Sequence, residues 1–154
     1  MERNASTSPA PTAWDVIHAA RRLSRRLEGQ LDDALEELAL SSAQFEILEL
    51  LRRDRNAHAA ALARRLGVSR QIASRLLAEL DRAGPVELLP LDGGVRVPIV
   101  TQGGRRRIEL AVDATAPIRE RIVHLAPDRR ETLVAIVEDL ENAIRPPQRP
   151  WWLD

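Results

Sequence analysis

A single glycine, Gly67, separates two amphipathic segments, and this break restricts the fold more than any other feature of the sequence. Both segments space their apolar residues by three or four positions, which predicts two α-helices. A glycine directly after a helix favours termination, and Ser69 is a good cap for the next helix. The sequence therefore predicts helices over residues 56–67 and 69–83, joined by a tight turn. The apolar residues expected to lock these helices together are Leu62, Ala63, Leu66, Ile72, Leu76 and Leu80.

A β-hairpin is predicted directly after the helix pair. The dipeptide Asp92-Gly93 lies between two apolar, β-leaning segments at residues 86–91 and 95–100. An Asp-Gly pair between such segments is typical of a hairpin turn. Pro98 cannot donate a backbone hydrogen bond, so the second strand is expected at a sheet edge.

The segment before the helix pair predicts two more helices. Apolar residues step by threes and fours over residues 14–38, as in a long amphipathic helix. Ser41 and Gln44 then have the spacing of a capping box, which predicts a helix over residues 42–54. His58 lies near the start of the following helix and is a candidate for its cap.

Two prolines divide the helical pattern after the hairpin. We expect a helix over residues 103–125 that is kinked or interrupted at Pro117. Pro127 suits the first turn of a final helix. The Pro-rich segment after Arg145 ends in Trp151-Trp152, which either packs in a dimer or ligand site or ends a disordered tail.

Composition excludes several classes of site. The chain has no cysteine, so it has no disulfide, thiolate metal site or cysteine nucleophile. Its three histidines show no metal-ligand spacing, and it contains neither a G-x-S-x-G motif nor a phosphate-binding loop. We therefore expect no catalytic residue, no metal and no cofactor. With no apolar run of about 18 residues and no signal peptide, we expect a cytoplasmic protein that is not an enzyme.

The charges are unevenly distributed although the formal net charge is zero. Residues 55–107 hold ten arginines against four acids, a net charge of +6, and the rest of the chain carries −6. A basic middle suits a surface that binds phosphate. Chance clustering gives the same distribution without any such surface, and the absence of lysine follows equally well from genomic base composition.

The exposed face of the second helix in the pair carries residues that suit DNA. Arginine pairs with guanine or phosphate, glutamine with adenine, and serine with a base or the backbone. The first turns of such a helix enter the major groove, and a following hairpin reaches the adjacent backbone. The candidate DNA-binding residues are Ser69, Arg70, Gln71, Ser74, Arg75 and, in the hairpin, Arg96.

Three segments resemble, in order, those of the MarR family of winged helix-turn-helix regulators. Residues 40–48 are similar to the family's L-T-x-x-Q-f-x-x-L opening, and residues 62–69 match its L-A-x-x-L-x-v-S segment. Residues 100–104 resemble the L-T-x-x-G that follows the wing. The resemblance covers residues 40–144, about two-thirds of the chain.

The resemblance implies a mainly α fold: a winged helix-turn-helix with a two-stranded β-wing and N- and C-terminal dimerisation helices. It further implies a homodimer that binds a pseudo-palindrome of double-stranded DNA, as a repressor, and that is released by a small aromatic or acidic effector. The expected parts are a disordered arm (1–12), an N-terminal dimerisation helix (13–40), the winged-helix region (41–102), C-terminal dimerisation helices (103–145) and the tail (146–154).

Two departures from the family pattern keep another function open. The wing is about two residues short, with Arg96 as the basic residue left near its tip, and Ala59-Ala60-Ala61 replace polar residues at the start of the helix pair. Both changes weaken expected contacts with the DNA backbone. The alternative is a winged-helix dimer that serves as a protein-interaction or ligand-binding module and does not read DNA.

Overall fold

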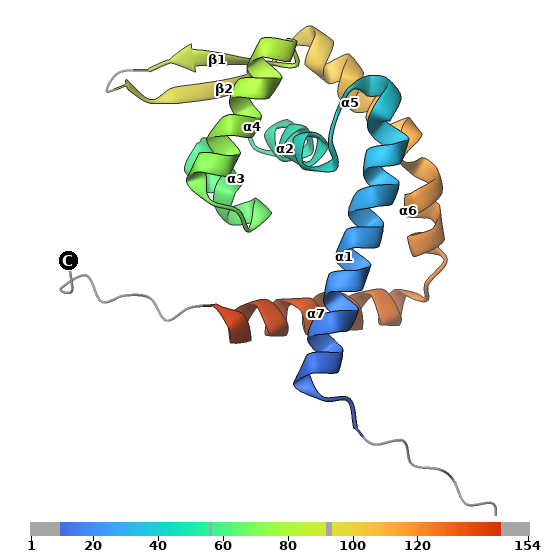
Figure 1. Ribbon diagram of the computed structural model, residues 1–154. Coiled ribbons are helices and arrows are strands. Elements are labelled where there is room, and N and C mark those ends of the chain that lie inside the picture. The colour runs from blue at the N-terminus through green and yellow to red at the C-terminus, as the bar shows by residue number, and fades with distance from the viewer. Residues whose placement is uncertain (1–9, 56, 92–93, 146–154) are drawn as a thin grey trace, which may run out of the picture. The chain divides into compact units, whose positions relative to one another are not determined.

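The computed structural model describes residues 10–55, 57–91 and 94–145 (Figure 1). Its elements are α1 (Ala13–Leu35), the 3-10 helix η1 (Glu36–Leu38), α2 (Ser42–Arg53), α3 (Ala59–Leu66), α4 (Arg70–Ala83), β1 (Val86–Pro90), β2 (Arg96–Val100), α5 (Gln102–Ala114), α6 (Ala116–Val123) and α7 (Pro127–Ile144). This order confirms the predicted mainly α fold with a two-stranded wing. Predictions for residues 1–9, Asn56, the Asp92-Gly93 turn and the tail from residue 146 lie outside the described residues.

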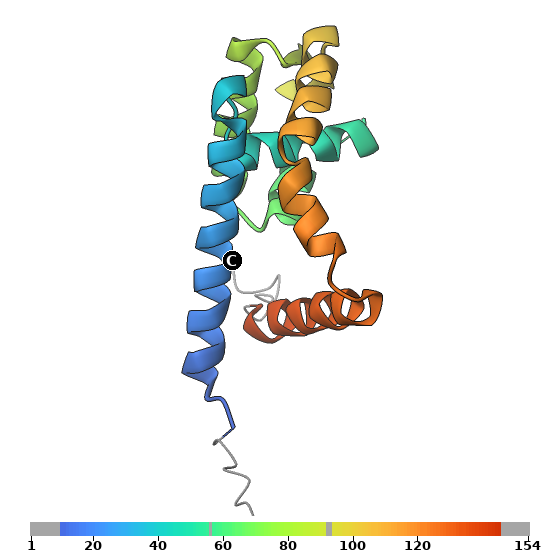
Figure 2. The same cartoon turned by 90° about the vertical axis from the view of Figure 1, so that its right-hand side faces the viewer.

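The chain divides into two compact units, residues 1–116 and 117–154. Helix α2 is central to the first unit: it lies crosswise between α1 and α5 (Figure 2) and also contacts α3, α4 and β2. Ile47, Leu48 and Leu51 of α2 are buried, and Phe45 is half-buried. They belong to one apolar core, whose largest fully buried side chains also include Leu35, Leu62, Leu80 and Val86.

The predicted capping box at the start of α2 is present. The Gln44 N–H donates to Ser41 Oγ at 3.2 Å, and the Ser41 N–H donates to Gln44 Oε1 at 3.1 Å. These two bonds satisfy backbone N–H groups at the start of the helix, which have no carbonyl partner within the helix.

Helix α1 begins at a second capping box, which the sequence did not predict. The Thr12 N–H donates to Asp15 Oδ2 at 2.9 Å, and the Asp15 N–H donates to Thr12 Oγ1 at 3.3 Å. Hydrogen bonds from the Thr12 hydroxyl and N–H hold the pKa of the Asp15 carboxyl below its ordinary value. Thr12 was assigned to the disordered arm, but in the structure it caps a helix of 23 residues.

Helix α3 begins at Ala59, three residues later than the sequence predicted. Ala57 instead lies buried before the helix, with 2% of its surface exposed, and His58 makes no side-chain capping bond. The turn after α3 is as expected. Gly67 has φ +66°, which a residue without Cβ adopts at no steric penalty, and Ser69 Oγ accepts the Ile72 N–H at 3.2 Å to start α4.

The buried face of helix α4 differs from the predicted one at a single residue, Ile72. Leu76 and Leu80 are buried as expected, together with Ala73 and Leu77. Ile72 is 41% exposed, so it does not lock the helix pair. The small side chain of Ala73 takes the buried position in that turn.

The two-stranded antiparallel sheet has the predicted hairpin connectivity. Val86 pairs with Val100 and Leu88 pairs with Pro98. Because the sheet has two strands, each has a free edge, and Pro98 is tolerated there although it cannot donate a ladder hydrogen bond.

The junction between wing and α5 explains the residues that resemble L-T-x-x-G. Thr101 Oγ1 accepts the Gly104 N–H at 2.9 Å and donates to the Gly84 carbonyl oxygen at 2.7 Å. Gly104 is buried against Pro85, and a Cβ at this position would overlap the Pro85 carbonyl oxygen. Thr101 therefore ties α5 to the end of α4, and Gly104 permits the close approach.

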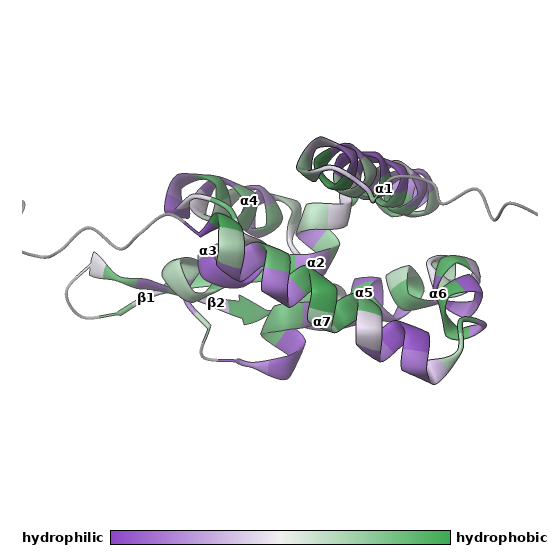
Figure 3. Ribbon diagram, turned by 90° about the horizontal axis from the view of Figure 1, so that it is seen from below, coloured by the Kyte–Doolittle hydropathy of each residue, from purple (hydrophilic) through white to green (hydrophobic). Residues whose placement is uncertain are grey.

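Each of the two helices after Ala114 has one of the two prolines in its first turn. Thr115 ends α5 just before Pro117, and Pro127 occupies the first turn of α7. No residue of α7 is buried, and apolar residues recur along it (Figure 3). Its exposed apolar side chains are Leu133 (45%), Val134 (57%), Ile136 (49%), Val137 (44%) and Ile144 (77%). A membrane span would require a longer and more apolar helix than any in the described part of the chain.

Candidate nucleic-acid interface

The first two turns of α4 present the predicted recognition residues to solvent. Arg70, Gln71, Ser74 and Arg75 are all exposed, while Ala73 and Leu77 point into the core. This separation follows from the helical period, because positions one turn apart share a face. The exposure of the four side chains agrees with the sequence analysis, and their role as DNA contacts stays a prediction.

A groove of about 420 Å³ brings three of the six candidates together. It runs between the start of α3, the outer face of α4 and the wing, and Arg70, Ser74 and Arg96 line it. Arg70 and Ser74 come from the recognition helix, and Arg96 is the first residue of β2. Two guanidinium groups from separate elements thus border one concave surface.

The start of α3 also borders this groove. Ala59 and Ala60 line it, and their N–H groups donate to no described residue. Free N–H groups at a helix start carry partial positive charge and favour an anion. The alanines, interpreted from the sequence as a weakness, have short side chains and lie half-buried at the groove.

The other three candidates lie outside the groove lining. Ser69 serves as the N-cap of α4, so its hydroxyl oxygen is already engaged with the Ile72 N–H. Arg75 Nε lies 3.7 Å from Glu79 Oε1, an ion pair that the sequence analysis missed although the i, i+4 spacing is a visible signal. Gln71 is exposed at the start of the helix.

The wing contributes a single basic residue and several apolar ones. Arg96 lies opposite Pro90, and the Leu91 N–H donates to the Val95 carbonyl oxygen at 2.7 Å beyond the paired strands. Leu89, Leu91 and Val95 are 42%, 56% and 48% exposed. The positive charge of this wing is therefore confined to Arg96, and the exposed Glu87 of β1 carries a negative charge.

Most of the basic middle segment lies elsewhere. Of its ten arginines, four are on the recognition helix and wing: Arg70, Arg75, Arg96 and, in the last turn of α4, Arg82. Arg65 NH2 instead pairs with Asp54 Oδ2 at 3.2 Å, and Arg55 lines a different pocket. The sequence could not show this division, because it depends on how distant segments pack.

Comparisons with known proteins agree on the fold. A family model described as an HTH domain matches residues 43–105, from α2 to the start of α5. No curated protein matches the sequence.

Several solved structures resemble the chain, among them the three that follow. The transcriptional regulator MosR of Mycobacterium tuberculosis is 24% identical with a TM-score of 0.70, over 82% of this chain and 95% of MosR. MepR of Staphylococcus aureus, in complex with DNA, is 18% identical with a TM-score of 0.75, over 83% of this chain and 96% of MepR. The MarR family protein Rv2887 of M. tuberculosis, in complex with p-aminosalicylic acid, is 22% identical with a TM-score of 0.61, over 80% of this chain and 95% of Rv2887.

Proposed function

We propose that this chain, whose fold is the winged helix of MarR-type regulators, is a DNA-binding transcriptional regulator that acts as a homodimer in the cytoplasm. The observation that carries the proposal is the groove in which Arg70 and Ser74 of α4 meet Arg96 of the wing. A surface with two separated guanidinium groups and a free helix start suits the phosphate backbone of a duplex.

The recognition helix would enter the major groove with its first two turns. Arg70, Gln71, Ser74 and Arg75 would then face base edges and phosphates, with a bidentate arginine contributing about 1–3 kcal/mol of discrimination. Arg96 would hold the backbone beside the recognition helix. Arg75 would have to give up its ion pair with Glu79 to contact DNA. We therefore propose Arg70 as the stronger of the two contacts.

The homodimer is supported by exposed apolar side chains on α1 and α7. Trp14, Ile17 and Leu23 of α1 are 68%, 43% and 49% exposed, and α7 buries nothing in a single chain. Helices of this length with exposed apolar faces gain stability when a second copy covers them. A two-fold dimer would present two recognition helices to half-sites about 10 bp apart.

Repression and release by an effector complete the proposal. Rv2887 holds p-aminosalicylic acid, which supports a small aromatic acid as the kind of molecule to test here. The solved structures with this fold are regulators, and a non-enzymatic role accords with them.

A second candidate function is an interaction module that does not read DNA. The observation in its favour is the wing, where Leu89, Leu91 and Val95 are exposed around a single arginine. Such a surface suits a protein partner better than a polyanion.

Selection of bound sequences from a random duplex library separates the two functions. A regulator enriches an inverted repeat with half-sites about one turn apart, because the dimer imposes its symmetry on the site. A folded dimer that enriches no sequence would contradict the proposal and favour the interaction module.

A further inference from the structure

His58 borders the candidate DNA groove and plays no part in capping the helix that it precedes. It is the N-cap residue of α3, yet its side chain makes no capping hydrogen bond and forms no hydrogen bond or ion pair with a described residue. The residue is exposed and lines the groove together with Arg70, Ser74 and Arg96. Its imidazole is therefore available to a molecule that occupies the groove.

The charged side chains that line the groove with His58 are both basic. Arg70 comes from α4 and Arg96 from β2, and no acidic residue is among the described residues of the lining. The ring thus has no carboxylate partner in this surface. An anion attracted by the two guanidinium groups would meet the imidazole as a further N–H donor, contributed by a third element.

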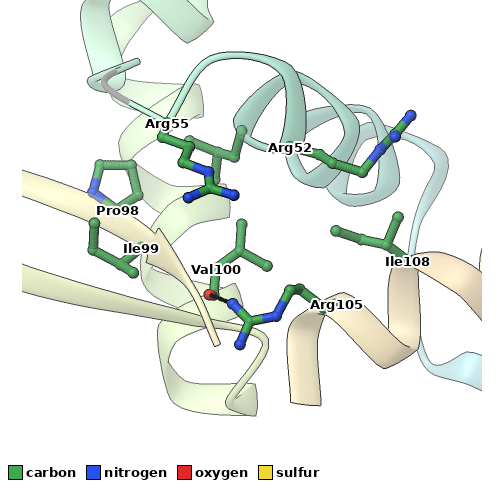
Figure 4. Close-up of a pocket in the computed structure, with 8 residues that line it drawn as sticks. Arg52, Arg55, Pro98, Ile99, Val100, Arg105 and Ile108 are labelled. Carbon is green, nitrogen blue, oxygen red and sulfur yellow. Dashed lines mark hydrogen bonds between the residues drawn. The ribbon is translucent and has the colours of Figure 1, made fainter. Parts of the chain in front are cut away.

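The charges in the segment that leads to His58 are directed elsewhere. Asp54 Oδ2 lies 3.2 Å from Arg65 NH2. Arg55 lines a separate pocket between the end of α2, strand β2 and the start of α5, where its guanidinium points toward Val100 (Figure 4). Neither Asp54 nor Arg55 lines the groove, so the two arginines of α4 and β2 are the charged neighbours of the ring there.

We propose that His58 is a further contact to the DNA backbone, made when its imidazole is protonated and pairs with a phosphate oxygen. Hydrogen bonds from a charged donor to a phosphate are shorter and stronger than neutral ones. The contact rests on the proposed function and extends it, because it adds the start of α3 to the recognition helix and the wing. The sequence showed His58 as a candidate cap, and its place in one groove with Arg70 and Arg96 arises from the packing of α3 beside α4 and the wing.

The contact makes DNA binding depend on pH. Arginine stays charged throughout the physiological range, whereas histidine gains or loses its charge between about pH 5 and 8. A phosphate beside the ring favours the charged form, so binding takes up a proton from the solvent, and affinity rises as the pH falls. The other two histidines of the chain, His18 and His124, do not line the groove, which assigns this dependence to one residue.

Fluorescence anisotropy titration of the full chain with a selected duplex tests the contact, at pH 6 and pH 8 and at 50 and 200 mM salt. His58→Gln removes the charge at both pH values, and His58→Lys fixes it at both. The matched controls are His18→Gln and His124→Gln, which remove histidines from α1 and from the turn after α6. His58 is exposed, so neither substitution at this position disturbs the core.

The unmodified chain should bind about three- to tenfold more tightly at pH 6 than at pH 8. Its salt slope should be steeper by about one at the lower pH, because one more phosphate is neutralised. His58→Gln should bind at both pH values as the unmodified chain does at pH 8, and His58→Lys as the unmodified chain does at pH 6. The two control variants should keep the pH dependence of the unmodified chain.

Four results would contradict the contact. Persistence of the pH dependence in His58→Gln, or its loss in either control, would overturn the assignment to His58. Equally weak binding by His58→Lys and His58→Gln would do the same, because a fixed charge should restore the contact. Equal affinity of the unmodified chain at the two pH values would refute the contact and leave the proposed function standing. Failure to bind any duplex at either pH would instead refute the proposed function, and the contact with it.

Discussion

Helices α2 and α7 carry similar numbers of apolar residues but use them differently. In α2, Ile47, Leu48 and Leu51 are fully buried among the other elements of the first unit. In α7 every apolar side chain keeps access to solvent. Burial of a Val, Leu or Ile side chain contributes about 1.5–3 kcal/mol. The winged-helix unit obtains this stabilisation within one chain, whereas α7 would obtain it only in the proposed homodimer.

The largest expected effect comes from a cavity in the first unit. Leu48→Ala should lower the free energy of unfolding by about 2–5 kcal/mol, because the surrounding core cannot close the space. Urea denaturation at low protein concentration measures it. The matched change in α7, Val137→Ala, should alter the free energy by less than about 1 kcal/mol and weaken self-association in sedimentation experiments. Equal destabilisation by both variants would contradict the comparison.

Substitution of either of two glycines by alanine gives the next largest expected effect on stability. Gly104→Ala should destabilise the chain by about 1–3 kcal/mol, because the new Cβ meets the Pro85 carbonyl oxygen. Gly29→Ala, in the open middle of α1 with no atom near its Cβ position, should stabilise the chain by up to about 1 kcal/mol. Thermal melts of the two variants should move in opposite directions, and a shift of the same sign would show that the junction can relax.

The elements that the sequence predicted correctly depend on neighbours a few residues apart. The capping box of Ser41 and Gln44, the stop at Gly67 and the cap at Ser69 all act within one turn of backbone. Thr12 follows the same rule and was missed because aspartate takes the place of the usual glutamate or glutamine.

Burial and pairing were predicted less well, because they depend on tertiary packing. Ile72 has the helical spacing of a core residue, yet Ala73 occupies the buried position. The helical spacing of the apolar residues was enough to predict that Arg70 is exposed. That Arg55 and Arg105, fifty residues apart, line one pocket could not be read from their spacing.

Removing the caps of the two N-terminal helices gives a smaller effect. Ser41→Ala should lower the free energy of unfolding by about 1 kcal/mol, because α2 lies in the core and any loss at its end destabilises the whole unit. Thr12→Ala should affect only the first turns of α1, which are exposed. Hydrogen exchange resolves the difference: α2 should lose protection with the global unfolding reaction, and α1 by local opening. Global destabilisation by Thr12→Ala would contradict this distinction.

The smallest effect is the pH dependence of the α1 cap. The pKa of Asp15 is lowered by its bonds to Thr12, so the cap stabilises the helix at neutral pH and is lost as the pH falls through the lowered pKa. The α2 cap uses the amide of Gln44 and does not titrate. NMR shifts should therefore show opening at the start of α1 below about pH 4, with α2 unaffected at that pH. If the first turns of α1 and α2 opened at the same pH, the two caps would not be independent.

The central claim is that the groove between α4 and the wing binds a duplex. Its most direct test is a fluorescence anisotropy titration of a selected inverted repeat at 50 and 200 mM salt, with the unmodified chain and Arg70→Gln. If six phosphates are contacted, affinity should fall about 10³-fold between the two salt concentrations. Arg70→Gln should bind about tenfold more weakly at low salt, and the salt slope should fall by about one if Arg70 contacts a phosphate. Affinity that does not depend on salt, or that is unchanged in Arg70→Gln, would contradict the assignment of this groove to DNA.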